Sequence, residues 1–297
     1  MYDVIIIGGG PAGLSAALNF GRGLKTALVI DAAEPRNKVK AESHGYLTQD
    51  GVSPAEFRKI AEDEVLKYDR ISIERDWVTN IEKTSDTFTV MTSKGQFTSR
   101  QVLLAAGIRE RSPEIKNFEQ FYGTSVFYCP WCDGYELRNR SLAVMVDENS
   151  INHMPMLISN WSSDLIICTN GTSKLSDEHK EIFKNKGFKY NESVITELNG
   201  ADGAVDSISF EDGENEKIEG MIALMEWDTQ FDFIKNLELK RGDTGKIEAD
   251  QFGATSMPGL FVAGETKTNF AGQLINAAAN GGDIAKFMIM MLVQEDY

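Results

Sequence analysis

Two cysteines separated by two residues form the clearest chemical motif of this sequence. They stand in the run Cys129-Pro130-Trp131-Cys132. This spacing brings two sulfur atoms close enough to form a disulfide, and it lowers the pKa of one thiol. The run therefore predicts a redox-active cysteine pair.

A zinc site is the alternative use of the same thiols. Structural zinc takes four ligands, and only Cys168 and three scattered histidines remain to complete such a set. Cys168 ends an apolar run that is typical of a buried strand, so we expect it in the core. The composition favours redox chemistry, and we predict no metal site.

A glycine-rich turn near the N-terminus is the second motif. Gly8, Gly10 and Gly13 have the spacing G-x-G-x-x-G between an apolar run and an Ala/Leu-rich helical run. Such glycines allow a tight turn and a close approach of the backbone to a pyrophosphate at the helix N-terminus. Asp31, which follows the next apolar run, is suited to binding ribose hydroxyls. The turn predicts dinucleotide binding, and a glycine turn without a ligand is the alternative.

The elements that must position these motifs indicate an α/β fold. The N-terminal segment has the pattern strand, turn, helix, strand, and the alternating segments at 69–105 predict antiparallel strands. After the cysteine motif, runs at 142–146 and 165–168 predict two strands flanking a helix of about ten residues. The other expected elements are a helix at 51–67, strands within 195–225, a strand at 259–263 and a helix at about 273–293.

Length and element order predict two domains, with the second inserted in the first. A chain of 297 residues exceeds one typical core, and its first and last segments together resemble a single domain. The expected domains are 1–114 with 248–297 and a central 115–247, with linkers near 112–118 and 244–250.

The composition limits the possible partners and location. A net charge of −15 argues against nucleic acid or an anionic membrane as partner. Three cysteines are too few for a secreted disulfide scaffold, and the first residues lack the pattern of a signal peptide. We therefore expect a cytoplasmic protein.

Three segments resemble the FAD-domain motifs of the thioredoxin reductase family. They lie at 3–13, 105–107 and 255–265, and the resemblance extends along the whole chain in order. It implies an α/β fold with two Rossmann-like, three-layer ββα nucleotide-binding domains, and FAD as the cofactor.

The resemblance also implies roles for single residues. The Cys132 thiolate would face the flavin, Cys129 would exchange with substrate, and Asp133 would be the acid or base of that exchange. Glu265 stands where the family usually has Asp, and it would hold the ribityl chain. For His44 a surface turn residue stays an open alternative. The residues expected around FAD are Gly8, Gly10, Pro11, Ala12, Gly13, Asp31, Arg36, Asn37, His44, Val78, Ala106, Gly107, Gly264, Glu265, Gln273 and Leu274.

The central domain departs from the family at its nucleotide loop. Thioredoxin reductases usually carry a second glycine-rich loop and a basic cluster for NADPH there. In this chain the strand at 142–146 is followed by Asp147-Glu148-Asn149-Ser150, without glycine. Two carboxylates would repel a pyrophosphate, and the next strand is followed by no arginine that could clamp a phosphate. The sequence therefore disfavours NADPH as the reductant.

The pattern resembles a branch of the family that works without pyridine nucleotides. That branch includes the dithiol oxidases of the gliotoxin type and the ferredoxin- or flavin-linked disulfide reductases. The oxidases commonly have His after the second cysteine, where this chain has Asp133, so the direction of electron flow stays open. The expected partner is a thioredoxin-like protein or a small dithiol or disulfide, and the resemblance implies a homodimer.

Two other functions stay open at the level of sequence. One is an NADPH-dependent thioredoxin reductase with an atypical nucleotide site. The other is a non-catalytic FAD redox sensor, which would have no use for an acid or base such as Asp133.

Overall fold

The computed structural model describes residues 1–228, 231–243, 245–267 and 272–297. The chain forms two compact units. Unit 1 comprises Met1–Lys38, Gly45–Arg109 and Asp228–Tyr297, and unit 2 comprises Val39–His44 and Glu110–Trp227.

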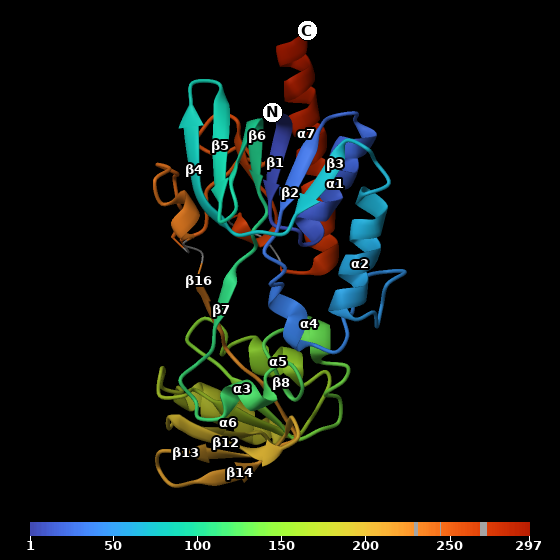
Figure 1. The fold of residues 1–297 in the computed structure, drawn as a ribbon. Coiled ribbons are helices and arrows are strands. Elements are labelled where there is room, and N and C mark those ends of the chain that lie inside the picture. The colour runs from blue at the N-terminus through green and yellow to red at the C-terminus, as the bar shows by residue number, and fades with distance from the viewer. Residues whose placement is uncertain (229–230, 244, 268–271) are drawn as a thin grey trace. The chain divides into compact units, whose positions relative to one another are not determined.

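Unit 1 is built on one mixed sheet with strand order β3-β2-β1-β6-β5-β4 (Figure 1). β6 pairs along one side with parallel β1, and its other side is shared by antiparallel β5 and parallel β17. The strands are β1 (Tyr2–Ile7), β2 (Ala27–Ile30), β3 (Ile71–Glu74), β4 (Val78–Thr84), β5 (Thr87–Thr92), β6 (Gln96–Leu104) and β17 (Leu260–Val262). The helices are α1 (Pro11–Arg22), η1 (Arg36–Val39), α2 (Pro54–Val65), η2 (Asp232–Ile234), η3 (Gly264–Thr266) and α7 (Leu274–Asp296).

The apolar run of β1 is explained by burial on both faces of the sheet. Val4 and Ile6 pack in a cluster with α1 and α7, whereas Ile5 and Ile7 pack in a cluster with the β4–β5 hairpin. Successive side chains of a strand point to opposite faces, so a strand covered on both sides needs an unbroken apolar sequence. Unit 1 therefore has the expected three layers: helices, parallel sheet and antiparallel hairpin.

Unit 2 repeats this architecture around the parallel sheet β11-β10-β9-β15-β8. Along β9, Ala143 and Met145 pack towards the antiparallel sheet β12-β13-β14, and Leu142 and Val144 pack towards α5 and α6. The strands are β8 (Val126–Phe127), β9 (Leu142–Met145), β10 (Leu165–Cys168), β11 (Lys189–Asn191), β12 (Ile195–Ala201), β13 (Ala204–Phe210), β14 (Asn215–Lys217) and β15 (Gly220–Ile222). The helices are α3 (Phe118–Phe121), α4 (Pro130–Asp133), α5 (Met154–Ile158) and α6 (Asp177–Lys186). The α/β fold with two Rossmann-like domains is confirmed.

The linkers lie earlier in the sequence than expected. β7 (Arg109–Arg111) and β16 (Glu226–Asp228) pair with each other where the chain leaves and re-enters unit 1. The segment that follows β16 was expected in the central domain, but Phe231, Ile234 and Ile247 are buried in the core of unit 1. Burial of these side chains assigns the segment to unit 1. Residue 244, the first of the expected second linker, lies outside the described residues.

Candidate active site

Cys129 and Cys132 are joined by a disulfide at the start of α4. Cys129 is the N-cap residue, and Pro130 occupies the first helical position, where its missing N–H is no loss. The helix ends at Asp133, and the next position requires Gly134, because a Cβ atom there would lie 2.8 Å from the Trp161 ring. Cys129 is buried and Cys132 is half-buried.

Asp133 is buried directly after the disulfide, with 6% of its surface exposed. Its Oδ2 accepts a hydrogen bond from Lys40 Nζ, and both side chains are largely shielded from solvent. Burial raises the pKa of the Asp133 carboxyl, and the nearby Lys40 ammonium opposes that rise without cancelling it. A carboxyl whose pKa is raised in this way suits an acid or base that works near neutral pH.

His44 lies in unit 2, not in the unit that carries the glycine motif. Its Nε2 is 3.5 Å from Glu42 Oε2 and 3.6 Å from Glu136 Oε1. The side chain is therefore held between carboxylates, one of which follows α4, and it is not an exposed turn residue. Its expected contact with FAD stays a prediction.

The glycine motif of unit 1 forms a tight turn between β1 and α1. Gly8 has φ +106°, and a Cβ atom there would lie 2.4 Å from the Ala105 carbonyl oxygen. A Cβ atom on Gly13 would lie only 1.9 Å from the Gly8 carbonyl oxygen. At Gly10, by contrast, no described atom lies within 4 Å of the position that a Cβ would take. The turn is closed on its inner side and open at Gly10.

This difference predicts a large loss of stability for one alanine substitution and a small loss for another. Gly13→Ala is expected to lower the free energy of unfolding by about 1–3 kcal/mol, because the new methyl group collides with backbone. Gly10→Ala is the matched control and is expected to cost less than about 1 kcal/mol, as for alanine at an N-cap. Urea unfolding of both variants measures the difference, and equal stabilities would contradict the tight packing at Gly13.

Several expected cofactor residues meet at the carboxyl edge of the parallel strands in unit 1. Gly8 follows β1, Asp31 follows β2, Ala106 follows β6, and Gly264 follows β17. Thr266 Oγ1 donates to the Gly107 carbonyl oxygen at 3.0 Å, which ties η3 to the segment after β6. Open α/β sheets bind ligands at this edge. Val78 instead opens β4 and packs on the hairpin side of the sheet.

Asp31 makes protein contacts that the sequence did not predict. Its Oδ1 accepts a hydrogen bond from the Gly9 N–H at 2.9 Å, and its Oδ2 accepts from Arg58 and Arg75. Both arginines also pair with Glu62. Asp31 thus fixes the glycine turn, and its expected contact with a ribose stays a prediction.

Glu265 is likewise paired within unit 1. Arg36 Nη2 donates to both Glu265 carboxylate oxygens at 2.9 Å. Lys246 lies nearby, and burial together with the Arg36 charge holds the pKa of its amino group below the usual value. Sequence reasoning named Arg36 and Glu265 separately, but it missed their pairing and missed Lys246.

Comparisons with known proteins agree with this arrangement. Residues 2–146 match the family model described as pyridine nucleotide-disulphide oxidoreductase. The chain is 31% identical over 278 residues to thioredoxin reductase tcpT of Claviceps purpurea, with 89% of this chain and 86% of the relative covered. It is 27% identical over 292 residues to thioredoxin reductase aclD of Aspergillus oryzae, with 94% and 91% covered. A Bacillus anthracis structure assigned as thioredoxin reductase TrxB matches with a TM-score of 0.95 and 34% identity over 100% of both chains.

This chain belongs to the thioredoxin reductase family. It is therefore a disulfide oxidoreductase of the flavin-dependent class, as the resemblance of its motifs implied.

The Asp147 carboxylate accepts local hydrogen bonds in the loop that follows β9. Asp147 Oδ1 accepts hydrogen bonds from the Asn149 N–H at 3.1 Å, the Ser150 N–H at 2.9 Å and the Ser150 hydroxyl at 2.6 Å. These bonds hold the pKa of Asp147 below its usual value. The segment forms turns, so α5 begins only at Met154 and has five residues instead of the expected ten or so.

Side chains also bond the loops that follow β9 and β10 to other elements of unit 2. His179 Nε2, near the start of α6, is 2.9 Å from Asn152 Oδ1 in the loop after β9. Asn170, after β10, uses its Oδ1 to accept the Ile195 N–H at 2.8 Å. Each of these two loops is thus held to a neighbouring element, α6 or β12.

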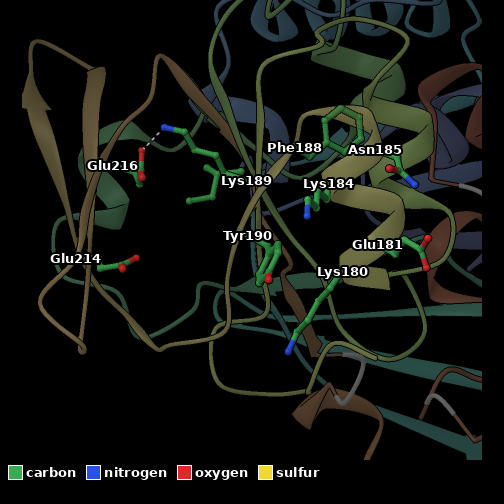
Figure 2. Close-up of a pocket in the computed structure, with 10 residues that line it drawn as sticks. Lys180, Glu181, Lys184, Asn185, Phe188, Lys189, Tyr190, Glu214 and Glu216 are labelled. Atoms are coloured by element: carbon green, nitrogen blue, oxygen red, sulfur yellow. Dashed lines mark hydrogen bonds and ion pairs between the residues drawn. The ribbon is translucent and has the colours of Figure 1, made fainter. Parts of the chain in front are cut away.

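Unit 2 also has an open groove between α6 and the edge strands β11 and β14 (Figure 2). Charges of both signs line it, and Lys189 and Glu216 pair across it at 2.6 Å. Among the described residues, those that line this groove include neither Cys129 nor Cys132. Cys168, which ends β10, is fully buried, as expected.

Two further findings hold for the described part of the chain. None of its helices has the length and apolar character needed to cross a membrane. Its His, Cys, Asp and Glu side chains form no group of three or more that could hold a metal ion.

Proposed function

We propose that this chain is an FAD-dependent thiol–disulfide oxidoreductase that works without NADPH. Electrons would pass between flavin, the Cys129–Cys132 pair and an external dithiol or disulfide. The observation that carries the proposal is the loop after β9, which has no glycine and whose Asn149 and Ser150 N–H groups already donate to the Asp147 carboxylate.

The carboxyl edge of unit 1 fits FAD. The space at Gly10 leaves room for a pyrophosphate, and α1 begins there without a side-chain cap. The free N–H groups of such a helix start attract an anion. We propose that the glycine turn holds the pyrophosphate, and that Glu265, Gln273 and Leu274 lie along the flavin end.

Two features of the corresponding edge of unit 2 disfavour a second dinucleotide. Besides the bonds of Asp147, the contact between Asn152 and His179 holds the start of α6 against the loop after β9. A bound nucleotide would have to break these bonds and bring phosphate next to a carboxylate.

The cysteine pair would work by two thiol–disulfide exchanges. A substrate thiolate attacks Cys129 Sγ, the bond to Cys132 breaks, and Cys132 leaves as a thiolate. The second substrate thiol then displaces Cys129, so the substrate departs as a disulfide and both cysteines are reduced. Asp133 gives or takes the proton of the Cys132 sulfur. When bound, FAD supplies the two-electron carrier that takes these electrons on, and the reverse sequence reduces a substrate disulfide.

Access to the disulfide requires a conformational change in this proposal. Cys129 has 7% of its surface exposed, so a thioredoxin-like protein or a small dithiol reaches it only after it is uncovered. By family analogy we further propose a cytoplasmic homodimer. The buried Asp133 next to the disulfide favours catalysis over a purely sensory role.

A binding titration tests the absence of an NADPH site. The intrinsic fluorescence of the holoenzyme is followed while NADPH is added, with inner-filter correction from free tryptophan. We expect no saturable change up to millimolar NADPH. Saturation in the micromolar range would restore the atypical NADPH-dependent thioredoxin reductase as the better account.

A further inference from the structure

The segment Val39–His44 belongs to unit 2 although both of its sequence neighbours belong to unit 1. One close backbone approach holds it there, although Val39, Ala41 and Glu42 are exposed. A Cβ atom on Gly123, whose φ is +88°, would lie 2.6 Å from the Val39 carbonyl oxygen. Only glycine therefore allows this approach, which brings the start of the segment beside the turn between α3 and β8.

Lys40 is the residue of this segment that contacts α4, the helix of the cysteine pair. Its Nζ donates to Asp133 Oδ2, with 12% of the lysine and 8% of the aspartate side chain exposed. The same ammonium group lies 5.2 Å from the centre of the Phe127 ring and 5.7 Å from that of Tyr128. Aromatic rings on this side stabilise a cation, and little water is present to screen its charge.

Other charged groups surround Asp133 more loosely. Glu136 raises the pKa of the Asp133 carboxyl, and His44 lowers it, whereas Lys40 is the strongest influence that favours the carboxylate. His44 itself lies between Glu42 and Glu136. Lys40 is thus the principal counter-charge of the buried carboxylate.

We propose that Lys40 is a positioning residue of the redox centre, whose ammonium group holds the Asp133 carboxylate in place and balances its charge next to Cys132. In this role Lys40 acts through Asp133. The inference deepens the proposed function, because it concerns the group that handles the proton of the exchange. A buried carboxylate that loses its partner is strongly disfavoured, so without Lys40 the Asp133 carboxyl keeps its proton to higher pH.

The test follows disulfide reduction in the full-length protein. Dithiothreitol reduces the Cys129–Cys132 bond, and acid quench followed by thiol labelling gives the rate of reduction. The ionisation of dithiothreitol also changes the rate with pH. Dividing the rate of the variant by that of the wild type at each pH removes this contribution. In the plot of reduction rate against pH, the limb that depends on Asp133 is the fall in rate as the Asp133 carboxyl loses its proton. Lys40→Met is expected to move this limb to higher pH by about 1 unit or more. Lys40→Arg keeps the charge and is expected to leave the limb near its wild-type position.

The aspartate variant separates indirect from direct action. In Asp133→Asn the limb disappears, and adding Lys40→Met to that variant is expected to change nothing further. A wild-type profile in Lys40→Met would overturn the proposal, as would an equal shift with and without Asp133. Lys40→Gln replaces Lys40→Met if the latter unfolds. The assay needs no flavin turnover, so failure of the proposed electron pathway would show separately, as intact disulfide exchange without flavin reduction.

Discussion

Cys132→Ser is expected to reduce dithiol-driven turnover of the flavin by at least about 10³-fold, as when the covalent group of a mechanism is removed. A serine oxygen cannot form the disulfide that stores the electron pair, and Cys129→Ser should fail for the same reason. The fold should survive both changes, because neither cysteine belongs to the core clusters of unit 2. Anaerobic single-turnover absorbance of the bound flavin measures the effect.

Cys168→Ala provides the matched control for the two cysteine variants. Cys168 is fully buried at the end of β10, and burial raises the pKa of its thiol well above the usual value. It therefore remains a neutral thiol and should not exchange with substrate. Turnover should persist in Cys168→Ala, and turnover that persisted in both active-site serine variants would remove the disulfide from the mechanism.

Asp133→Asn is expected to slow the exchange by about 10²–10⁴-fold, the usual contribution of a general acid or base. The asparagine keeps the shape of the side chain but cannot give or take a proton. The sign of the pH effect follows from burial, which raises the pKa of Asp133. Below that pKa the carboxyl carries a proton and serves as the acid, and above it the carboxylate serves only as a base.

The pH profile distinguishes this chemical role from a structural one. In the wild type, the rate of the step that needs the acid should fall as pH rises through the pKa of Asp133. That limb should be absent in Asp133→Asn. Glu148→Gln makes the same charge change at an exposed position of unit 2 and should leave rate and profile unaltered. An unchanged profile in Asp133→Asn would assign the proton transfer to another group.

The local parts of the fold could be predicted from sequence because their signals are local. The unbroken apolar run of β1 and the glycines after it identify a buried strand and a tight turn within about a dozen residues. The disulfide follows from the spacing of two cysteines. Family membership, which the motifs implied, is confirmed by relatives that cover most of the chain.

The contacts that shape the site could not be predicted, because they join distant residues. Lys40 and Asp133 are 93 positions apart, and no local pattern marks the lysine as a partner. The same holds for the pair of Arg36 and Glu265. It also holds for the two arginines that bind the Asp31 carboxylate. The predicted length of α5 was wrong for another reason. We interpreted Asp147 as a charge that repels phosphate, but its carboxylate also stabilises the turn that precedes α5, so the helix begins later than expected.

The central claim is that electrons reach the flavin through the cysteine pair and not from NADPH. The most direct test adds NADPH, or separately dithiothreitol, to the anaerobic holoenzyme and follows the flavin absorbance in a stopped-flow instrument. We predict bleaching by the dithiol alone, with a long-wavelength thiolate–flavin band that is lost in Cys132→Ser. Bleaching by NADPH within seconds would contradict the account and establish an ordinary NADPH-dependent thioredoxin reductase.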